Sequence, residues 1–263
     1  MGEATASPDS PALQMEGVAV ASMQDPQVIV AEEINWTVNT GDYWVIAGLQ
    51  GSGKSDFLMV AGGLSAPKSG NYHFFGEQMP IFEDARLRKR LRLGFVFDNA
   101  RLLGRLTVRE NVALPLQYHH NLAEPKVDDD VMRILETLEL ASVADNLPST
   151  LPRGIQKRAA LARALALKPE VLLVDNPLGG LDVRHSNWWL GFLDQLSHGH
   201  PLLDGRPATL VIASADLMPW KGRARQFALL GNQHLRVLGD WAQLEAAEED
   251  LLRELLTGQT QTG

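Results

Sequence analysis

The chain contains no cysteine, which excludes disulfide bonds and thiolate metal sites and fits a reducing compartment. No stretch approaches the roughly 18 consecutive apolar residues that a membrane-spanning helix needs. Basic residues are in the minority, with 24 Lys and Arg against 32 Asp and Glu and a net charge of −8. A nucleic-acid-binding surface needs a basic face, so this balance argues against nucleic acid as a partner. We expect contact with a membrane only through partner proteins.

The length of 263 residues suffices for one large domain with a sizeable core, with or without a subdomain. The N-terminus has no basic start followed by an apolar stretch, so we expect no secretory signal. Small, polar and acidic residues dominate residues 1–15, which predicts a disordered tail. Residues 246–263 are predicted to form an amphipathic helix followed by a tail.

The most specific motif is Gly48-Leu-Gln-Gly-Ser-Gly-Lys-Ser55, which matches G-x-x-x-x-G-K-[ST]. Glycines let main-chain N–H groups point at phosphate oxygens, Lys54 would reach the β- and γ-phosphates, and the Ser55 hydroxyl would ligate Mg²⁺. A buried strand is predicted before the motif, at 43–47, and a helix after it. The alternative is a glycine-rich turn with a surface lysine. The sequence favours a phosphate-binding loop whose contacts come from Gly48, Gln50, Gly51, Ser52, Gly53, Lys54, Ser55 and Asp56.

The order of the predicted elements indicates an α/β fold built on a P-loop NTPase core. Strands at 43–47, 171–175 and 209–213 alternate with helices, which predicts a mostly parallel central sheet. Further strands at 28–30, 34–38 and 71–75 fit an antiparallel β subdomain. The helical stretch from about 99 to 166 is predicted to be an inserted helical subdomain.

A second part of a nucleotide site lies far downstream of the loop. The predicted strand 171–175 ends in Asp175, which would hold Mg²⁺ through water. Between and after the two parts stand further landmarks in a fixed order: 94–98, 106–112, 151–165 and Leu181-Asp182. From about residue 16 to 245 this pattern resembles the ATP-binding cassette (ABC) family, specifically the nucleotide-binding subunit of ABC transporters. The stretch 157–166 is similar to MCE-linked (Mla-type) lipid-transport ATPases.

The resemblance implies how such a chain would work. In that family two cassettes pair head to tail, and each ATP lies between the P-loop of one and the signature segment of the other. The implied cofactors are therefore ATP and Mg²⁺. The implied partners are a second ABC subunit, either a copy of this chain or a paralogue, and a transmembrane permease. These partners would hold the chain in the cytoplasm, on the inner face of the cell membrane.

Several positions depart from the family pattern. Asn176 stands where the family has the glutamate that polarises the attacking water, and Ala215 stands at the switch histidine. Asp98 replaces the glutamine that senses the γ-phosphate. In the signature segment Arg153 replaces the first glycine, and Gly154 is the glycine that remains. An asparagine amide cannot accept a proton, and a positioned general base contributes roughly 10²–10⁴ in rate.

These departures leave three hypotheses. The first is a subunit that binds Mg-ATP and hydrolyses it poorly or not at all. The second is a working ATPase in which Asp98 or Asp216 takes over from the missing catalytic residues. In it, Ser55, Asp98 and Asp175 would hold Mg²⁺. Arg153 would make a charge-assisted contact with the phosphate. The third is a structural subunit that no longer needs nucleotide.

Overall fold

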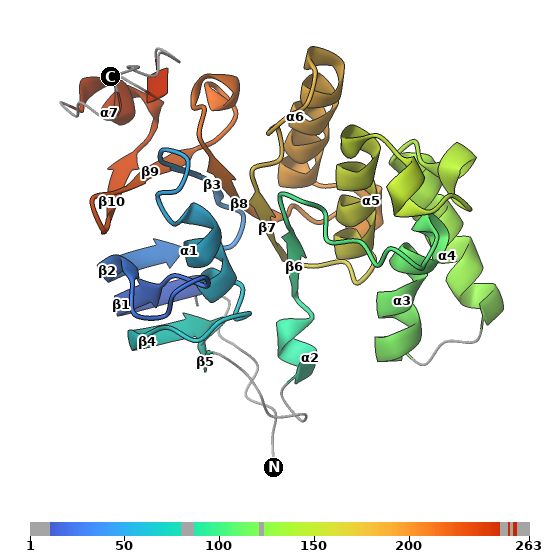
Figure 1. Cartoon of the computed structure of the whole chain (residues 1–263), viewed down its shortest axis with the longest axis horizontal. Coiled ribbons are helices and arrows are strands. Elements are labelled where there is room, and N and C mark those ends of the chain that lie inside the picture. The colour runs from blue at the N-terminus through green and yellow to red at the C-terminus, as the bar shows by residue number, and fades with distance from the viewer. Residues whose placement is uncertain (1–10, 80–86, 121–123, 248–251, 253–254, 257–263) are drawn as a thin grey trace. The chain divides into compact units, whose positions relative to one another are not determined.

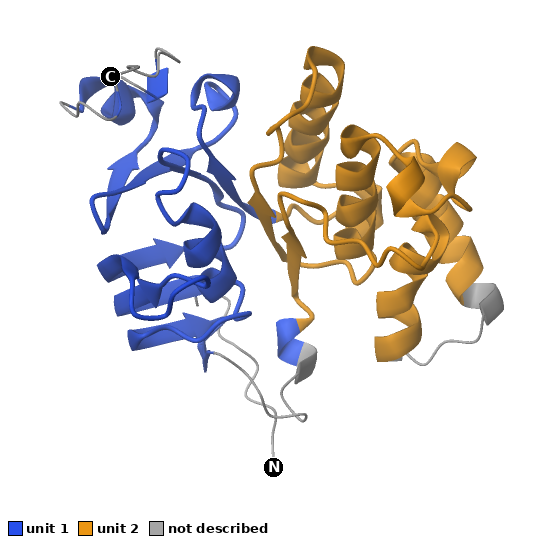
Figure 2. Cartoon of the chain, viewed as in Figure 1, with its two compact units in different colours: residues 1–90, 209–263 blue, residues 91–208 orange. Residues whose placement is uncertain are grey.

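The structure is a computed structural model that describes residues 11–79, 87–120, 124–247, 252 and 255–256. The chain divides into two compact units, one formed by residues 1–90 and 209–263 and the other by residues 91–208 (Figure 2).

Unit 1 combines the two ends of the chain (Figure 1). Its elements are β1 (Leu13–Ala21), β2 (Ile29–Val38), β3 (Tyr43–Ala47), α1 (Lys54–Ala61), β4 (Ser69–Phe74), β5 (Glu77–Gln78), α2 (Leu87–Arg90), β8 (Thr209–Ser214), β9 (Gln226–Gly231), β10 (His234–Gly239) and α7 (Trp241–Ala246).

Two kinds of sheet occur in unit 1. Strands β2, β1, β4 and β5 pair in that order, and all their pairings are antiparallel. Strand β3 pairs in parallel with β8 on one side and with β9 on the other, and β10 is antiparallel to β9. The predicted parallel core and antiparallel β subdomain are therefore confirmed.

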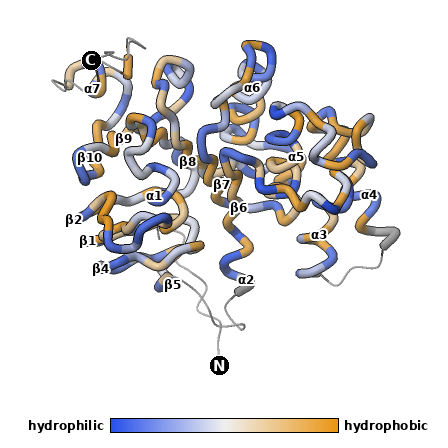
Figure 3. Tube along the Cα trace, viewed as in Figure 1, coloured by the Kyte–Doolittle hydropathy of each residue, from blue (hydrophilic) through white to orange (hydrophobic). Residues whose placement is uncertain are grey.

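The core of unit 1 surrounds β3 and α1. Every residue of β3 is buried, and the apolar residues of β8 and β9 stand out in Figure 3. Helix α1 packs against β1 and β2 and also against β8. The Trp36 ring lies 5.7 Å from that of Trp44 and 5.2 Å from that of Phe57. This aromatic contact fixes the helix that follows the predicted phosphate loop.

The described residues of unit 2 form a short parallel strand pair and four α-helices, with short 3-10 helices in the connections. Its elements are β6 (Leu93–Val96), α3 (Val108–His120), α4 (Glu124–Thr137), α5 (Arg153–Leu165), β7 (Val171–Asp175) and α6 (Val183–His198). Strand β6 pairs in parallel with β7, and α5 packs against α3, α4 and β6. Helix α3 begins with a capping box, in which Thr107 and Glu110 each accept the other's main-chain N–H through a side-chain oxygen. Both strands of this unit lead directly into predicted site residues.

The structure corrects some predicted boundaries. Strand β1 begins at Leu13, inside the predicted tail, because Leu13 and Met15 are buried and pair with β2. The predicted strands 28–30 and 34–38 form one strand with register shifts. Unit 2 starts at 91 and ends at 208, so it is wider than the predicted helical subdomain of 99–166. Residues 1–10 and most of 246–263 lie outside the described residues.

Candidate functional site

The loop from Gly48 to Gly53 is shaped by its glycines. Gly51 and Gly53 have φ of 82° and 89°, a region that residues with a Cβ seldom adopt. A Cβ at Gly53 would also lie 2.7 Å from the Val30 Cβ, and one at Gly48 would collide with the Leu230 main-chain oxygen. Glycine is therefore the residue that fits at positions 48, 51 and 53, as a loop that cradles phosphate requires.

Helix α1 presents its N-terminus at the end of this loop. Gly53 caps the helix without a side chain, so no side-chain oxygen occupies its first amide groups. The Lys54 ammonium donates to the main-chain oxygens of Gly48, at 2.7 Å, and Leu49, at 2.6 Å. Asp56 accepts from the Met23 main-chain N–H at 2.9 Å. Main-chain amides at a helix N-terminus and a lysine over the loop suit a polyphosphate, so this part of the site fits the predicted group.

The end of β8 lies at the same edge of the sheet as the loop. In the parallel register Ala47 pairs with Ser214, so Ala215 follows directly beside the start of the loop. Ala215 is exposed and has no group that can hydrogen-bond to a phosphate through its side chain. Asp216 caps the next turn, because its Oδ1 accepts from the Met218 main-chain N–H at 3.0 Å.

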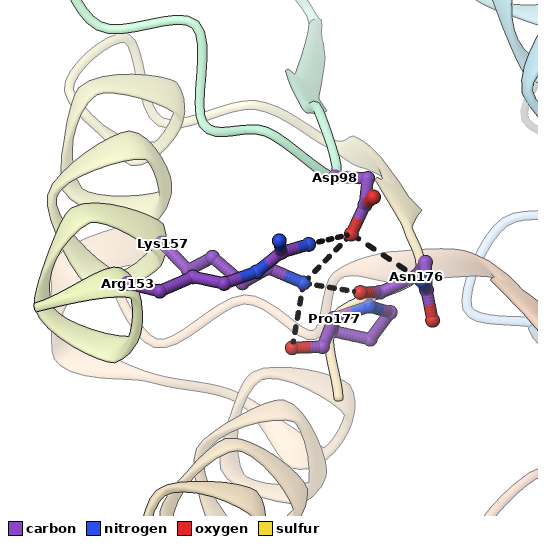
Figure 4. Close-up of polar contacts among 5 residues, drawn as sticks. All are labelled: Asp98, Arg153, Lys157, Asn176 and Pro177. Atoms are coloured by element: carbon purple, nitrogen blue, oxygen red, sulfur yellow. Dashed lines mark hydrogen bonds and ion pairs between the residues drawn. The ribbon is translucent and has the colours of Figure 1, made fainter. Parts of the chain in front are cut away.

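In unit 2, Asp98 is the centre of a polar cluster (Figure 4). Its Oδ1 accepts from Lys157 Nζ at 2.9 Å, from the Arg153 guanidinium at 3.0 Å and from Asn176 Nδ2 at 3.3 Å. Arg153 and Lys157 both come from α5, Asp98 follows β6, and Asn176 follows β7. The cluster therefore joins three segments that are far apart in the chain.

Lys157 is the buried member of this cluster. Its side chain is 1% exposed, compared with 38% for Asp98. Besides Asp98, its ammonium donates to the main-chain oxygens of Asn176, at 2.6 Å, and Pro177, at 3.5 Å. Burial lowers the pKa of Lys157, and the hydrogen bond and charge of Asp98 oppose this change.

The predicted Mg²⁺ residue Asp175 is the last residue of β7 and is buried. Asn176 follows it with a φ of 47°, and the chain turns back so that the Gly179 N–H donates to the Asn176 main-chain oxygen. Among the residues that the structure describes, no three His, Cys, Asp or Glu side chains gather into a metal-holding group. A Mg²⁺ ion bound with a nucleotide does not require such a group, because phosphate oxygens and waters supply most of its ligands.

Gly154 lies beneath the ring of His185. A Cβ at Gly154 would lie 2.9 Å from the His185 Cγ, so only glycine permits this approach of α5 to the start of α6. Asp182 caps α6 by accepting the His185 main-chain N–H at 2.8 Å, and this hydrogen bond lowers the pKa of Asp182. The Gly154 position is thus fixed by close packing.

The family described as "ABC transporter" matches residues 31–179, more than half of the chain. The chain belongs to the ABC transporter family. It is 31% identical over 230 residues to MlaF of Escherichia coli K12, the ATP-binding protein of an intermembrane phospholipid transport system, covering 87% of this chain and 83% of MlaF. The predicted likeness to the ATP-binding subunit of ABC transporters and to Mla-type ATPases is confirmed.

Two other similarities agree with this assignment. The nickel import ATP-binding protein LarO of Lactiplantibacillus plantarum is 33% identical over 215 residues, which cover 80% of this chain and 86% of LarO. Among solved structures, the dimeric ATP-binding cassette MJ0796, determined in a post-hydrolysis state with ADP and Pi, matches with a TM-score of 0.76 and 26% identity. That match covers 86% of this chain and 98% of the other. None of the described helices combines the length and the apolar character that crossing a membrane requires.

The predicted site residues thus fall into two groups, each within one unit. The loop residues and Ala215 lie at one sheet edge in unit 1. In unit 2, Asp98, Arg153 and Asn176 contact one another through Asp98, whereas Gly154 packs under His185. The sequence did not predict a role for Lys157, although a lysine within an alanine- and leucine-rich helix is a signal that it could be buried.

Proposed function

We propose that this chain binds Mg-ATP and hydrolyses it slowly or not at all, and so acts as an ATP-gated subunit of its transporter. The intact phosphate loop supports the binding half of this proposal. Ser55 and Asp175 are the residues that we propose for Mg²⁺. Arg153 and Gly154 are proposed to contact the nucleotide of the paired cassette.

Asn176 carries the second half of the proposal. Its side-chain Nδ2 donates to Asp98, so the amide is used as a hydrogen-bond donor. An amide has no basic lone pair with which to take a proton from water, and a missing general base lowers rates by roughly 10²–10⁴. The chemistry of this one side chain supports the proposal of impaired hydrolysis.

The alternative of a working ATPase needs a substitute base. Asp98 is a weak candidate, because its Oδ1 accepts from a buried lysine, an arginine and an amide. Asp216 uses its Oδ1 to cap a turn. The Oδ1 atom of each carboxylate is thus already engaged by hydrogen-bond donors of the protein, which leaves it less available to an attacking water.

The proposed partners are a transmembrane permease and a second cassette, and the proposed location is the cytoplasmic face of the membrane. In a head-to-tail pair, Asn176 would alter the site that holds this chain's own loop, and Arg153 would alter the opposite site. A homodimer would therefore contain two doubly altered sites. A heterodimer with an unaltered cassette would contain two singly altered ones.

The cargo that we propose is a lipid. This proposal rests on the similarity to MlaF, which covers 87% of this chain. It predicts that phospholipid co-purifies with the complex of this chain and its permease.

The test compares the purified wild-type chain with Asn176→Glu and with the matched control Asn176→Gln. The wild type should bind Mg-ATP with little release of phosphate. Asn176→Glu supplies a carboxylate and should raise phosphate release by about 10-fold or more, whereas Asn176→Gln, which keeps an amide, should not. Turnover by the wild type at the rate of ordinary ABC ATPases, or an equal gain in both variants, would contradict the proposal.

A further inference from the structure

Lys157 lies on a helix rich in alanine and is almost completely buried, yet its ammonium makes several polar contacts. Its ammonium, almost completely buried, meets one carboxylate oxygen and two main-chain oxygens. A buried charge is tolerated only when it is paired and hydrogen-bonded. The three oxygens supply the three acceptors that an ammonium group can use.

The two cations that contact Asp98 differ in their surroundings. Arg153 is 52% exposed and Lys157 is 1% exposed, although both reach the same oxygen. An exposed ion pair contributes little to stability and exchanges readily with water. The Lys157 ammonium is almost fully buried and has little water to replace the carboxylate, so Lys157 is the lasting partner of Asp98.

Lys157 also holds the turn that carries Asn176. The Asn176 main-chain oxygen accepts from both Lys157 Nζ and the Gly179 N–H. The Asn176 side chain lies against Gly179, where a Cβ would lie 2.6 Å from the Asn176 Cγ. The backbone of Asn176 is left-handed, a conformation that asparagine adopts more readily than most residues, and the two hydrogen bonds to its main-chain oxygen hold this turn.

We propose that Lys157 is the positioning residue of this half of the site: it binds Asp98 and the main chain of Asn176 at once, and so sets the direction of the side chain at position 176. This inference rests on the proposed function, because it states what orients the residue at the position of the missing base. Lys157 acts through the turn and does not itself contact the reacting groups.

The functional test uses the full chain carrying Asn176→Glu, in which residue 176 can act as a base. Into this chain we introduce Lys157→Met, which keeps the length of the side chain without its charge, and Lys157→Arg, which keeps the charge. Lys168→Met is the matched control, because Lys168 forms an exposed ion pair with Asp204 in the same unit.

Lys157→Met should lower kcat for phosphate release by about 10-fold or more, since small displacements of a catalytic group cost that much. The KM for ATP should change by less than about 2-fold, because the phosphate loop is unaltered. Lys157→Arg should recover part of kcat. Lys168→Met should have the same kcat as the chain that carries Asn176→Glu alone. An unchanged kcat, or a KM that rises in proportion to the loss of kcat, would overturn the proposal.

A second measurement does not depend on activity. In the wild-type chain, Lys157→Met should speed amide hydrogen exchange at residues 176–180, and Lys168→Met should not. If Asn176→Glu gives no gain in turnover, the proposed function fails, yet this exchange experiment still decides the role of Lys157. If exchange at these residues does not change, the inference about Lys157 is overturned and the proposed function is not.

If Lys157→Met does not fold, Lys157→Gln replaces it in both experiments. If neither variant folds, the inference is also overturned, since Lys157 would then serve folding as a whole.

Discussion

Gly53 and Gly41 illustrate how two residues with the same backbone conformation can differ in importance. Their φ angles are 89° and 84°, so a side chain at either position is strained. A Cβ at Gly53 would also press against Val30, whereas nothing lies within 4 Å of one at Gly41. Strain acts at both sites, but only Gly53 shapes the phosphate loop.

We therefore predict that Gly53→Ala abolishes ATP binding, whereas Gly41→Ala retains it. Each substitution should destabilise the fold by about 1 kcal/mol or more through backbone strain, with an added steric cost at Gly53. Isothermal titration with Mg-ATP and urea unfolding would measure the two effects. Equal losses of ATP affinity in both variants would show that the loop geometry is not what binds the phosphates.

The elements of unit 2 are set in register by contacts at the start of each strand. The Arg92 main-chain oxygen, just before β6, accepts from the N–H groups of Glu170 and Val171 at 2.7 and 3.0 Å. The Arg92 guanidinium also donates to both carboxylate oxygens of Glu170, at 2.6 and 2.8 Å. Because β6 leads to Asp98 and β7 leads to Asn176, this pairing helps to bring the polar cluster together.

The Arg92–Glu170 pair predicts a pH dependence of stability. The hydrogen bond from Arg92 lowers the pKa of the Glu170 carboxyl below its usual value of 4.5. The pair therefore stabilises the fold at pH values above 4.5, and this contribution is lost as the pH falls from 4.5 through the lowered pKa of the folded state. Both side chains are about one third exposed, so the effect at neutral pH should be about 1 kcal/mol or less.

Urea unfolding of the wild type and Glu170→Gln would measure this contribution. The wild type should be the more stable at neutral pH, and the difference should shrink once the pH lies below the lowered pKa. A difference that stays constant at all pH values would mean that packing, and not the charge, accounts for the effect.

At the scale of the whole molecule, each unit contributes its own group of site residues. Unit 1 is assembled from residues 1–90 and 209–263, and the intervening segment forms unit 2. Unit 1 supplies the phosphate loop, and unit 2 supplies Asp175 and the polar cluster around Asp98. A ligand that binds only the folded chain must raise the stability of the whole.

We predict that Mg-ATP at about 100 times its Kd stabilises the chain by about 2.7 kcal/mol. Thermal unfolding with increasing Mg-ATP should show a rising melting temperature, and Lys54→Ala should remove the rise. A melting temperature that does not respond in the wild type would favour the structural subunit that needs no nucleotide.

Much of the fold follows from patterns that are local in the chain. The run 43–47 predicts its strand to the residue because every position is apolar or aromatic, and the capping box at Thr107 marks the start of α3. By contrast, the first three residues of β1 fall inside the predicted tail of 1–15, and β10 is not among the predicted strands. Strand β1 is stabilised by pairing with β2 and β4, whereas β10 is a mostly exposed strand that pairs with β9, and composition reveals neither pairing.

The sequence by itself determined the phosphate-loop motif, the alternation of strands and helices, and the presence of an amide at Asn176, where the family pattern has a glutamate. These features depend on residue type and spacing along the chain. Only the tertiary structure decided that Asp98 is paired with Lys157, 59 positions away, and contacts Asn176, 78 positions away. The physical reason is that burial and ion pairing are set by which segments fold together, and no local pattern specifies that.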